Sequence, residues 1–593
     1  MLGKEAMRAL GPAGIPALLL FCTVASAQSV VVTTADDLAD PPFDADAPCG
    51  VGTVDDLPGA DGEVSLREAL TAANNTGGPQ AIRFAAELEG ATIQIAFDDA
   101  DADDTPDPLA LLCGGMTDVD GDVNGDGAPD IHLVGDAALP PLSAALSIFS
   151  SLNTIRGLRV SGFQVGIGVS HVAIFTAEPA FVGNVIAGNS IEGAITCIFV
   201  QGGSYTDPTL AGVVRDTTVV DNVLNECGSY GVFVFTCDAP HSTVAGTRIE
   251  RNQLADGGQF GIAVQANLSA LGAQSLIDDT VVHGNEVTGF GATGITAFSF
   301  AGGENQITRL SISDNVSLDN VLGIAVVGGV CGARESRTEA AVLGNVVNNS
   351  LIATGGSGFN CVPEMGLAEA NQLDVHLADN RVREVALSGG LIVIGGSEGA
   401  VENDVVALVE GNQIVAVTGV AVVGGQGGPP GTRRNADRNH VNATVRANAS
   451  ANSGVGLAVT GGGSGDANGN TVMAVLTENA VCNNLLADVQ CYGGLPAIVG
   501  SPFPPNQGRD NRVDVRIAEN EASRISPAQS GVPNNTCVAE IVENTPCRPG
   551  DANCDRFVTA ADLIAQARLD AAGETSPCGL DAPVAIIVAA VFA

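Results

Sequence analysis

The feature that most constrains this chain is an asparagine that recurs along most of its length, usually 30 to 36 residues apart. An aliphatic residue stands three positions before each of these asparagines. In the better copies the apolar residues continue backwards at every second position, which predicts a strand with one buried face. The recurring positions are Asn189, Asn222, Asn252, Asn285, Asn315, Asn345, Asn380, Asn412, Asn448, Asn479 and Asn520.

A second apolar strand follows most of these asparagines, as in Gly323-Ile324-Ala325-Val326, and paired glycines often close it. Strand, asparagine turn, strand and glycine turn, repeated without helices, predict an all-β solenoid over residues 151–530. A propeller blade would need about 40 residues and four antiparallel strands, and a sandwich would not keep one residue type in register. We expect each asparagine to adopt the left-handed turn conformation and to hydrogen-bond to its equivalents above and below. The sequence also resembles the right-handed parallel β-helix proteins of bacterial surfaces and secretomes.

The two ends of the chain predict further segments. Residues 1–27 combine Lys4 and Arg8, an apolar run and Ala25-Ser26-Ala27, which is typical of a secretory signal cleaved before Gln28. Because no later stretch reaches the roughly 20 apolar residues of a spanning helix, we expect a secreted or cell-surface bacterial protein. We assign residues 28–150 to an N-terminal cap and residues 531–593 to a C-terminal module.

Within the cap, residues 63–74 predict a helix that begins with a capping box of Ser65 and Glu68. Its apolar stripe, formed by Leu66, Ala69, Leu70 and Ala73, could plug the first coil. These residues resemble the CSLREA motif of secreted bacterial β-helix proteins, with Val64 in place of the cysteine. An acidic stretch follows between residues 98 and 130, and it predicts either a solvated loop or a calcium site.

The C-terminal module predicts one calcium-binding loop with EF-hand spacing, and calcium is the only cofactor that we expect. The segment resembles one dockerin type I repeat, with Arg556 where glycine is usual and without a complete second repeat. Binding to a cohesin is therefore not expected, since that surface uses two repeats. The predicted ligands are Asp551, Asn553, Asp555, the carbonyl of Phe557, Thr559 and Asp562.

The charge and the cysteines limit the partners and the compartment. The net charge is −42, and the only lysine, Lys4, lies in the predicted signal. Such a chain repels nucleic acid, so we expect an extracellular glycan or a cell-surface protein as the partner. Fourteen cysteines indicate an oxidising compartment. The pairs suggested by proximity in the sequence are Cys227 with Cys237, Cys331 with Cys361, and Cys482 with Cys491; looser guesses are Cys49 with Cys113 and Cys554 with Cys578, with Cys197 unpaired.

Catalytic residues are not evident in the sequence. Counting back four positions from the ladder asparagines finds Arg248, His376 and Arg516, which would lie far apart along a solenoid. Carboxylates directly before the ladder are interpreted as turn residues, and Phe233, Phe235, Phe298 and Phe300 as core. We therefore predict a non-catalytic structural or interaction protein; the alternative is a glycan-binding protein or a polysaccharide lyase or glycoside hydrolase. The turn carboxylates are Asp221, Asp314, Asp379, Glu478 and Glu519.

Overall fold

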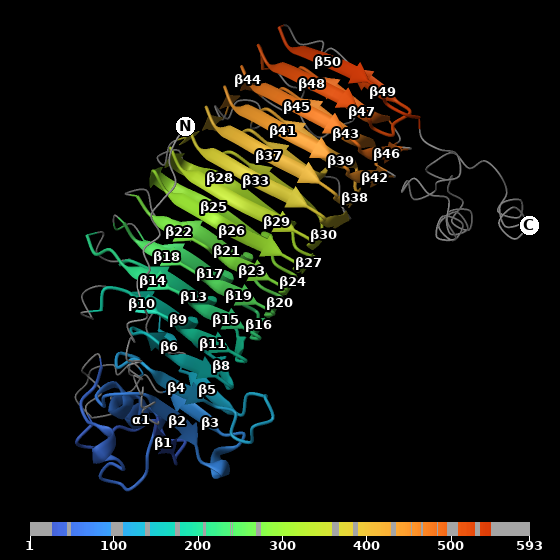
Figure 1. Cartoon of the computed structure of the whole chain (residues 1–593). Helices are drawn as coiled ribbons and strands as arrows, with labels where there is room; N and C mark the ends of the chain where they lie inside the picture. The colour runs from blue at the N-terminus through green and yellow to red at the C-terminus, as the bar shows by residue number, and fades with distance from the viewer. Residues whose placement is uncertain are drawn as a thin grey trace, which may run out of the picture.

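The computed structural model describes residues 27–546, and Figure 1 shows their strands stacked in parallel into one elongated column. The predicted signal, up to residue 26, and the predicted calcium loop, Asp551 to Asp562, lie outside the described residues. The gaps within the range are 44–48, 96–108, 110, 137–142, 172–177, 205–208, 238, 240, 268–273, 359–366, 384–388, 428–434, 452, 464–465, 483, 485, 495–507 and 528–533.

The strands form three long parallel sheets, and most coils add at least one strand to each of them, as expected of a parallel β-solenoid. The first sheet has 20 strands. These are β1 (Gln28–Val32), β2 (Gln80–Phe84), β4 (Thr117–Asp120), β7 (Thr154–Arg156), β10 (Phe181–Val182), β11 (Val185–Ala187), β14 (Val213–Arg215), β15 (Thr218–Val220), β18 (Thr243–Ala245), β19 (Arg248–Glu250), β22 (Leu276–Asp278), β23 (Val281–His283), β26 (Gln306–Ser313), β29 (Arg337–Leu343), β33 (Gln372–Ala378), β37 (Asp404–Glu410), β41 (His440–Arg446), β45 (Thr471–Thr477), β48 (Arg512–Ala518) and β50 (Thr536–Val542).

The second sheet has 13 strands, most of them three residues long, and follows the asparagine turn. Its strands are β3 (Thr92–Ile95), β5 (Ile131–Gly135), β8 (Leu158–Ser161), β12 (Ser190–Glu192), β16 (Val223–Asn225), β20 (Gln253–Ala255), β24 (Glu286–Thr288), β27 (Val316–Leu318), β30 (Val346–Asn348), β34 (Arg381–Arg383), β38 (Gln413–Val415), β42 (Ala449–Ala451) and β46 (Ala480–Cys482).

The third sheet contains the predicted second apolar strands and returns the chain to the first sheet. Its strands are β6 (Ala144–Ile148), β9 (Val165–His171), β13 (Thr196–Gly202), β17 (Tyr230–Thr236), β21 (Phe260–Ala266), β25 (Thr293–Gly303), β28 (Leu322–Arg334), β31 (Leu351–Thr354), β32 (Ala368–Glu369), β35 (Gly389–Ile394), β36 (Ala400–Val401), β39 (Thr418–Val423), β40 (Ala436–Asp437), β43 (Val455–Thr460), β44 (Ala467–Asn468), β47 (Ala487–Tyr492) and β49 (Ile525–Pro527).

The parallel pairing of strands continues beyond both ends of the solenoid that we expected from the sequence, residues 151 and 530. β1 pairs in parallel with β2, β2 with β4, and β4 with β7, so strands before residue 150 already belong to the first sheet. At the other end β50, which begins after residue 530, pairs in parallel with β48. The column of coils therefore runs from Gln28 to Val542 in the part of the chain that the structure describes.

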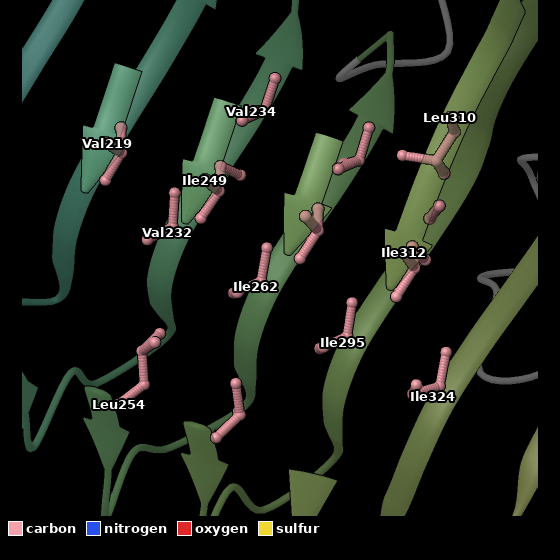
Figure 2. Close-up of a cluster of buried hydrophobic side chains, with 14 of the residues drawn as sticks. Val219, Val232, Val234, Ile249, Leu254, Ile262, Ile295, Leu310, Ile312 and Ile324 are labelled. Carbon is pink, nitrogen blue, oxygen red and sulfur yellow. The ribbon is translucent and has the colours of Figure 1, made fainter. Parts of the chain in front are cut away.

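The interior is a continuous file of aliphatic side chains, as the sequence predicts. All eleven aliphatic residues that stand three positions before a ladder asparagine have at most 1% of their surface exposed. Figure 2 shows Val219, Ile249 and Ile312 at this position in their strands, each pointing into the space that the sheets enclose. Because every coil buries this position against the coils on either side, the file supplies the hydrophobic core of the solenoid.

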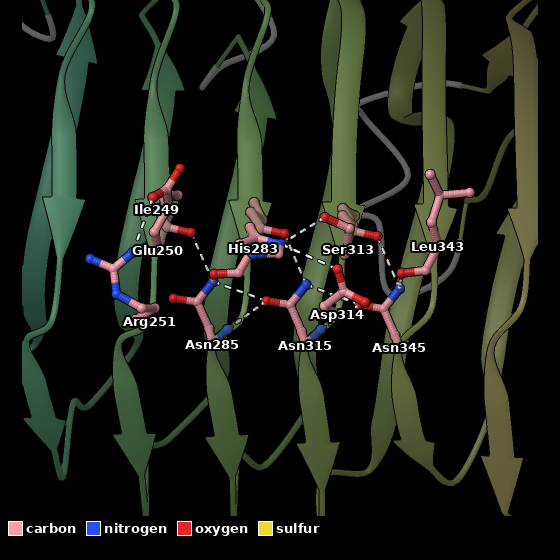
Figure 3. Close-up of polar contacts among 12 residues, drawn as sticks. Ile249, Glu250, Arg251, His283, Asn285, Ser313, Asp314, Asn315, Leu343 and Asn345 are labelled. Atoms are coloured by element: carbon pink, nitrogen blue, oxygen red, sulfur yellow. Dashed lines mark hydrogen bonds and ion pairs between the residues drawn. The ribbon is translucent and has the colours of Figure 1, made fainter.

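The asparagine ladder is confirmed over its whole predicted length and has one further rung, Asn544. In each rung the side-chain Nδ2 donates to the Oδ1 of the asparagine one coil on, at 2.8 to 3.1 Å. The backbone N–H donates to the same Oδ1, as from Asn285 to Asn315. Figure 3 shows three consecutive members, Asn285, Asn315 and Asn345. Buried amides are thereby satisfied at every turn.

The expected left-handed conformation of the asparagines is wrong, because the residue before each asparagine adopts it instead. Asp221, Asp314 and Glu478 have φ angles of 55°, 54° and 58°, and Gly188 has 60°. The chain turns from the first sheet into the second at this position, and the next residue aims its amide into the solenoid. Glycine and short polar residues tolerate such a φ best, which explains several of the carboxylates that precede the ladder.

A second asparagine ladder, absent from the sequence predictions, begins the strands of the later coils. Its members donate from Nδ2 to the next Oδ1 at 2.9 to 3.1 Å. Each stands nine residues before a member of the first ladder, so a constant offset in the sequence could have revealed it. The members are Asn371, Asn403, Asn439, Asn470, Asn511 and Asn535.

The N-terminal end of the column is closed by α1 (Leu66–Asn74), the only α-helix among the described residues. The predicted capping box is present, since Ser65 Oγ accepts from Glu68 N at 3.1 Å and Glu68 Oε2 accepts from Ser65 N at 2.9 Å. Leu66, Ala69, Leu70 and Ala73 are fully buried in the common core. The predicted plug is confirmed. The buried Arg67 is paired with Asp37, its Nη2 lying 2.7 Å from Asp37 Oδ2.

Three disulfides join described cysteines, and they correct most of the pairs suggested by proximity. Cys49–Cys113 is confirmed, but Cys227 is bonded to Cys197 and Cys491 to Cys537. The predicted pairs Cys227–Cys237 and Cys482–Cys491 and the unpaired state of Cys197 are therefore wrong.

The geometry of the coils explains these corrections. The seven-residue strand β17 separates positions 227 and 237, whereas stacking places β13, which contains Cys197, beside β17, and the Cα atoms of Cys197 and Cys227 lie 5.7 Å apart. The disulfides indicate an oxidising, extracytoplasmic compartment. Among the described residues, no helix is long and apolar enough to cross a membrane.

Candidate functional site

A groove of about 550 Å³ lies on the outer face of the first sheet, where it crosses β29, β33, β37, β41 and β45. These five strands have seven residues each and alternate between buried and outward side chains. They pair in register, so equivalent outward residues form files that run across the coils. The groove therefore follows the solenoid axis over successive coils.

One file forms the edge of the groove near the start of the strands. It consists of the first residue of each strand: Arg337, Gln372, Asp404, His440 and Thr471. Neighbouring members are about 4.8 Å apart, the spacing of paired strands. Most of these side chains are exposed and carry hydrogen-bonding atoms. The edge thus offers a regular row of donors and acceptors.

The next outward file forms the floor and alternates polar and apolar groups. Asp374 and Asn442 are exposed and polar, whereas Val406 and Met473 expose 51% and 52% of their surface. Exposed apolar side chains grouped on one face are characteristic of a binding surface. A ligand with both hydroxyl groups and apolar C–H faces would match this floor.

A third group of outward side chains lies beside the groove, and in it the carboxylate of Glu410 bonds to side chains of the two neighbouring strands. His376 Nε2 lies 2.9 Å from Glu410 Oε1, and Arg446 Nε donates to Glu410 Oε2 at 2.6 Å. The hydrogen bond from Arg446, and then that from His376, hold the pKa of the Glu410 carboxyl below its usual range. An ionised Glu410 accepts the Nε2 proton of His376, which leaves imidazole Nδ1 as the basic nitrogen.

The residues found by counting back four positions lie on this sheet but do not form a site together. Arg248 is on β19, His376 on β33 and Arg516 on β48, so only His376 lies on a strand that lines the groove. The turn carboxylates Glu478 and Glu519 come directly after the last residues of β45 and β48, whereas the groove lies near the start of the strands. Their left-handed backbone supports their interpretation as turn residues.

The groove residues themselves were missed, although the ladder gives their positions. They stand eight and six residues before a first-ladder asparagine, and Glu410 and Arg446 stand two before. Counting back to every outward position, and not only to the fourth residue before each asparagine, would have aligned these residues with one another. What the ladder does not indicate is which stretch of the face is hollowed.

The acidic loop after β4 satisfies its carboxylates with its own backbone. Asp122 Oδ1 and Oδ2 accept from the N–H groups of Gly125 and Gly127, and Asp130 Oδ2 accepts from Val123 N. Among the described residues, no group of three or more histidine, cysteine, aspartate or glutamate side chains is arranged to hold a metal ion. Residues 98–108 and 110 of the acidic stretch lie outside the described residues, so the solvated loop and the calcium site both stay predictions.

Two of the phenylalanines interpreted as core, Phe233 and Phe235, belong to a separate cluster on the outer face of the third sheet. Phe233 and Phe235 are buried there, with stacked rings whose centroids are 4.2 Å apart, and Tyr230 stacks on Phe233 at 4.0 Å. The prediction that this pair is core is confirmed in that both side chains are buried, but they pack in this second cluster and not among the aliphatic residues of the solenoid interior. Rings that stack on one another hide their faces, so this cluster offers little surface for stacking a sugar.

Comparisons with known proteins show no family for this chain. No protein-family model and no curated protein matches the chain, so the resemblances of residues 63–74 and 551–562 rest on those residues alone.

Among solved structures, the chain is similar to a mutant of the periplasmic alginate epimerase AlgG, with 12% identity and a TM-score of 0.30 over 67% of this chain and 77% of that one. The A-modules of the Azotobacter vinelandii mannuronan C-5 epimerases AlgE4 and AlgE6 are 12% and 13% identical, each with a TM-score of 0.24. They match over 79% and 80% of this chain and 87% and 92% of their own.

Proposed function

We propose that this protein is an extracytoplasmic β-solenoid that binds an extended, neutral glycan in the groove on its first sheet, without transforming it. The observation that carries the proposal is the groove itself, a row of polar side chains beside an exposed apolar floor that repeats from coil to coil. A polymer of repeated sugar units can place successive hydroxyl groups along such a row. A stack of rigid coils also requires little reorganisation on binding.

The charge of the site and of the chain favours a neutral over an acidic glycan. Asp374 and Asp404 line the groove, and Arg337 lies 3.9 Å from the carboxylate of Glu339. A polyanion would approach carboxylates on a chain with a net charge of −42. Carboxylates instead suit sugar hydroxyls, because each oxygen accepts hydrogen bonds from O–H donors.

The test is a binding screen of the mature chain with neutral and acidic polysaccharides, by affinity electrophoresis and calorimetry. We expect retardation by at least one neutral polymer, and loss of most of that affinity in Asp404→Ala and Asn442→Ala. Gln253→Ala, an exposed polar change on the second sheet, is the matched control and should bind as the parent does. Retardation by acidic polymers alone, or groove variants that bind like the control, would contradict the proposal.

The second candidate function is catalysis on a polysaccharide, and one observation favours it. An imidazole held by an ionised carboxylate, as His376 is by Glu410, has the arrangement of a general base. The same screen separates the two functions if released reducing ends and unsaturated sugars are measured. Turnover that disappears in His376→Gln would establish an enzyme, whereas binding without turnover supports the first proposal.

A calcium-binding module at the C-terminus completes the proposed function. The spacing of oxygen-bearing residues from Asp551 to Asp562 supports it, and its role would be to order the segment that follows the solenoid. A cohesin is not the proposed partner, because only one complete loop is present.

A further inference from the structure

The last coil of the solenoid exposes apolar residues that all earlier coils bury. In β48 the inward residues Val513, Val515 and Ile517 expose 0%, 4% and 1% of their surface. The equivalent residues of β50 are Cys537, Ala539 and Ile541. The first two are only partly buried, and Ile541 exposes 46%.

The opposite end of the column shows what a closed end looks like. The inward residues of the first strand, Val30 and Val32, expose 3% and 0%. They belong to the same core as Leu66 and Leu70 of α1, which lies over that end. β50, by contrast, pairs only with β48 among the described strands. Solenoids need a cap at both ends, because an open apolar coil with an unpaired strand edge promotes aggregation.

The chain continues from this open coil. The described residues end at this coil, where Thr545 forms a parallel bridge with Glu521, and residues 547–593 follow in the sequence. Their last ten residues, from Val584 to Ala593, are all apolar. Five of these ten are valine or isoleucine residues, which favour strand packing. They are Val584, Ile586, Ile587, Val588 and Val591.

From this placement we infer that the segment Val584–Ala593 docks onto the last coil and packs against Ile541 and the free edge of β50. The attachment of the segment to the same chain raises its effective concentration well above that of a second copy. The net charge of −42 further opposes the approach of another molecule. The occupant is therefore this chain's own segment Val584–Ala593 rather than a partner subunit.

The test uses the whole mature chain and a matched pair of substitutions on one strand. Ile541→Asp places a carboxylate at the inferred contact, whereas Val538→Asp changes a residue that faces outward and is already 58% exposed. We expect Ile541→Asp to make residues 584–593 accessible to elastase and to speed amide exchange in residues 536–542 by about tenfold or more. Val538→Asp should leave both measurements unchanged.

A second variant keeps the inference testable if Ile541→Asp misfolds. Removal of residues 582–593 should speed exchange in β50 and cause concentration-dependent association, with β45 still protected. Unchanged exchange in β50 after this removal would overturn the inference. So would protection of β50 that appears only at concentrations where the full chain dimerises, since a second copy would then be the occupant.

Discussion

Asn315 donates from its side-chain Nδ2 to Oδ1 of Asn345, one coil on, at 3.0 Å, while its own Oδ1 accepts from Asn285 at 2.9 Å. The contact repeats from Asn189 to Asn544, so every internal rung is both donor and acceptor. Removal of one rung therefore affects the coils on both sides of it.

Replacement of one rung should destabilise the protein much more than a change at the adjacent turn. Asn315→Ala leaves the buried amides of Asn285 without their acceptor, and an unsatisfied buried polar group costs about 1 to 3 kcal/mol. Asp314→Gly places glycine where φ is 54° and should cost little. The free energy of unfolding in urea measures both, and equal losses would contradict the role given to the ladder.

Aspartate substitutions at a buried and at an exposed position of β41 should lower the stability of the protein by very different amounts. Val445 is fully buried, whereas Asn442 on the same strand is exposed. Val445→Asp should cost several kcal/mol, about 3 to 5, because it puts an unpaired carboxylate in the core. Asn442→Asp should cost less than about 0.5 kcal/mol. Thermal unfolding of both variants checks the predicted orientation, and a comparable loss in the second would refute it.

The disulfide between Cys197 and Cys227 should stabilise two consecutive coils. It closes a loop with a sequence separation of 30, for which about 2 to 4 kcal/mol is typical. The double substitution of both cysteines by alanine should lower the free energy of unfolding by about that amount. Peptide mapping without reduction should find the pair, and a 227–237 link in its place would show the assignment to be incorrect.

The pH dependence of the N-terminal cap should follow Glu68. Burial raises the pKa of its carboxyl, while hydrogen bonds from the N–H groups of Ser65 and Asp40 act in the opposite direction. Between the ordinary glutamate pKa of about 4.3 and the raised value, the folded cap binds more protons than the unfolded one, so its stability falls as pH rises.

We therefore expect the amides of α1 to be better protected near pH 5 than near pH 7, after correction for intrinsic exchange rates. Glu68→Gln should flatten this dependence whatever its effect at a single pH. A slope identical to that of the parent would show that other groups set the dependence.

Calcium should order the C-terminal module without stabilising the coils. The carboxylates of Asp551, Asp555 and Asp562 repel one another in an empty loop, and calcium removes that repulsion. Stabilisation should grow with free calcium, by about 2.7 kcal/mol at one hundred times the dissociation constant.

Chelator should make the chain after about residue 540 sensitive to protease while residues 150–520 stay resistant. Asp551→Ala and Asp562→Ala should have the effect of chelator even in calcium. A chelator response that survives in both variants would place the calcium elsewhere, and the absence of binding to an isolated C-terminal fragment at millimolar calcium would dismiss the site.

The sequence by itself determined the repeat, the buried position and the cap. The offset of three residues between Val445 and Asn448 is set by the local geometry of strand and turn, so it is visible in any one coil. The capping box of Ser65 and Glu68 is likewise contained in four consecutive residues. Such features depend on neighbours along the chain, and their sequence signals are correspondingly direct.

The tertiary structure alone decided what happens between coils. Cys197 meets Cys227, and His376 meets Glu410, because stacking brings together residues 30 to 34 positions apart. The segments that connect the third sheet to the first differ in length from coil to coil, and only the folded stack shows which part of the outer face is hollowed. The left-handed residue before each asparagine also follows from the fold, since the amide must point inward to reach the next rung.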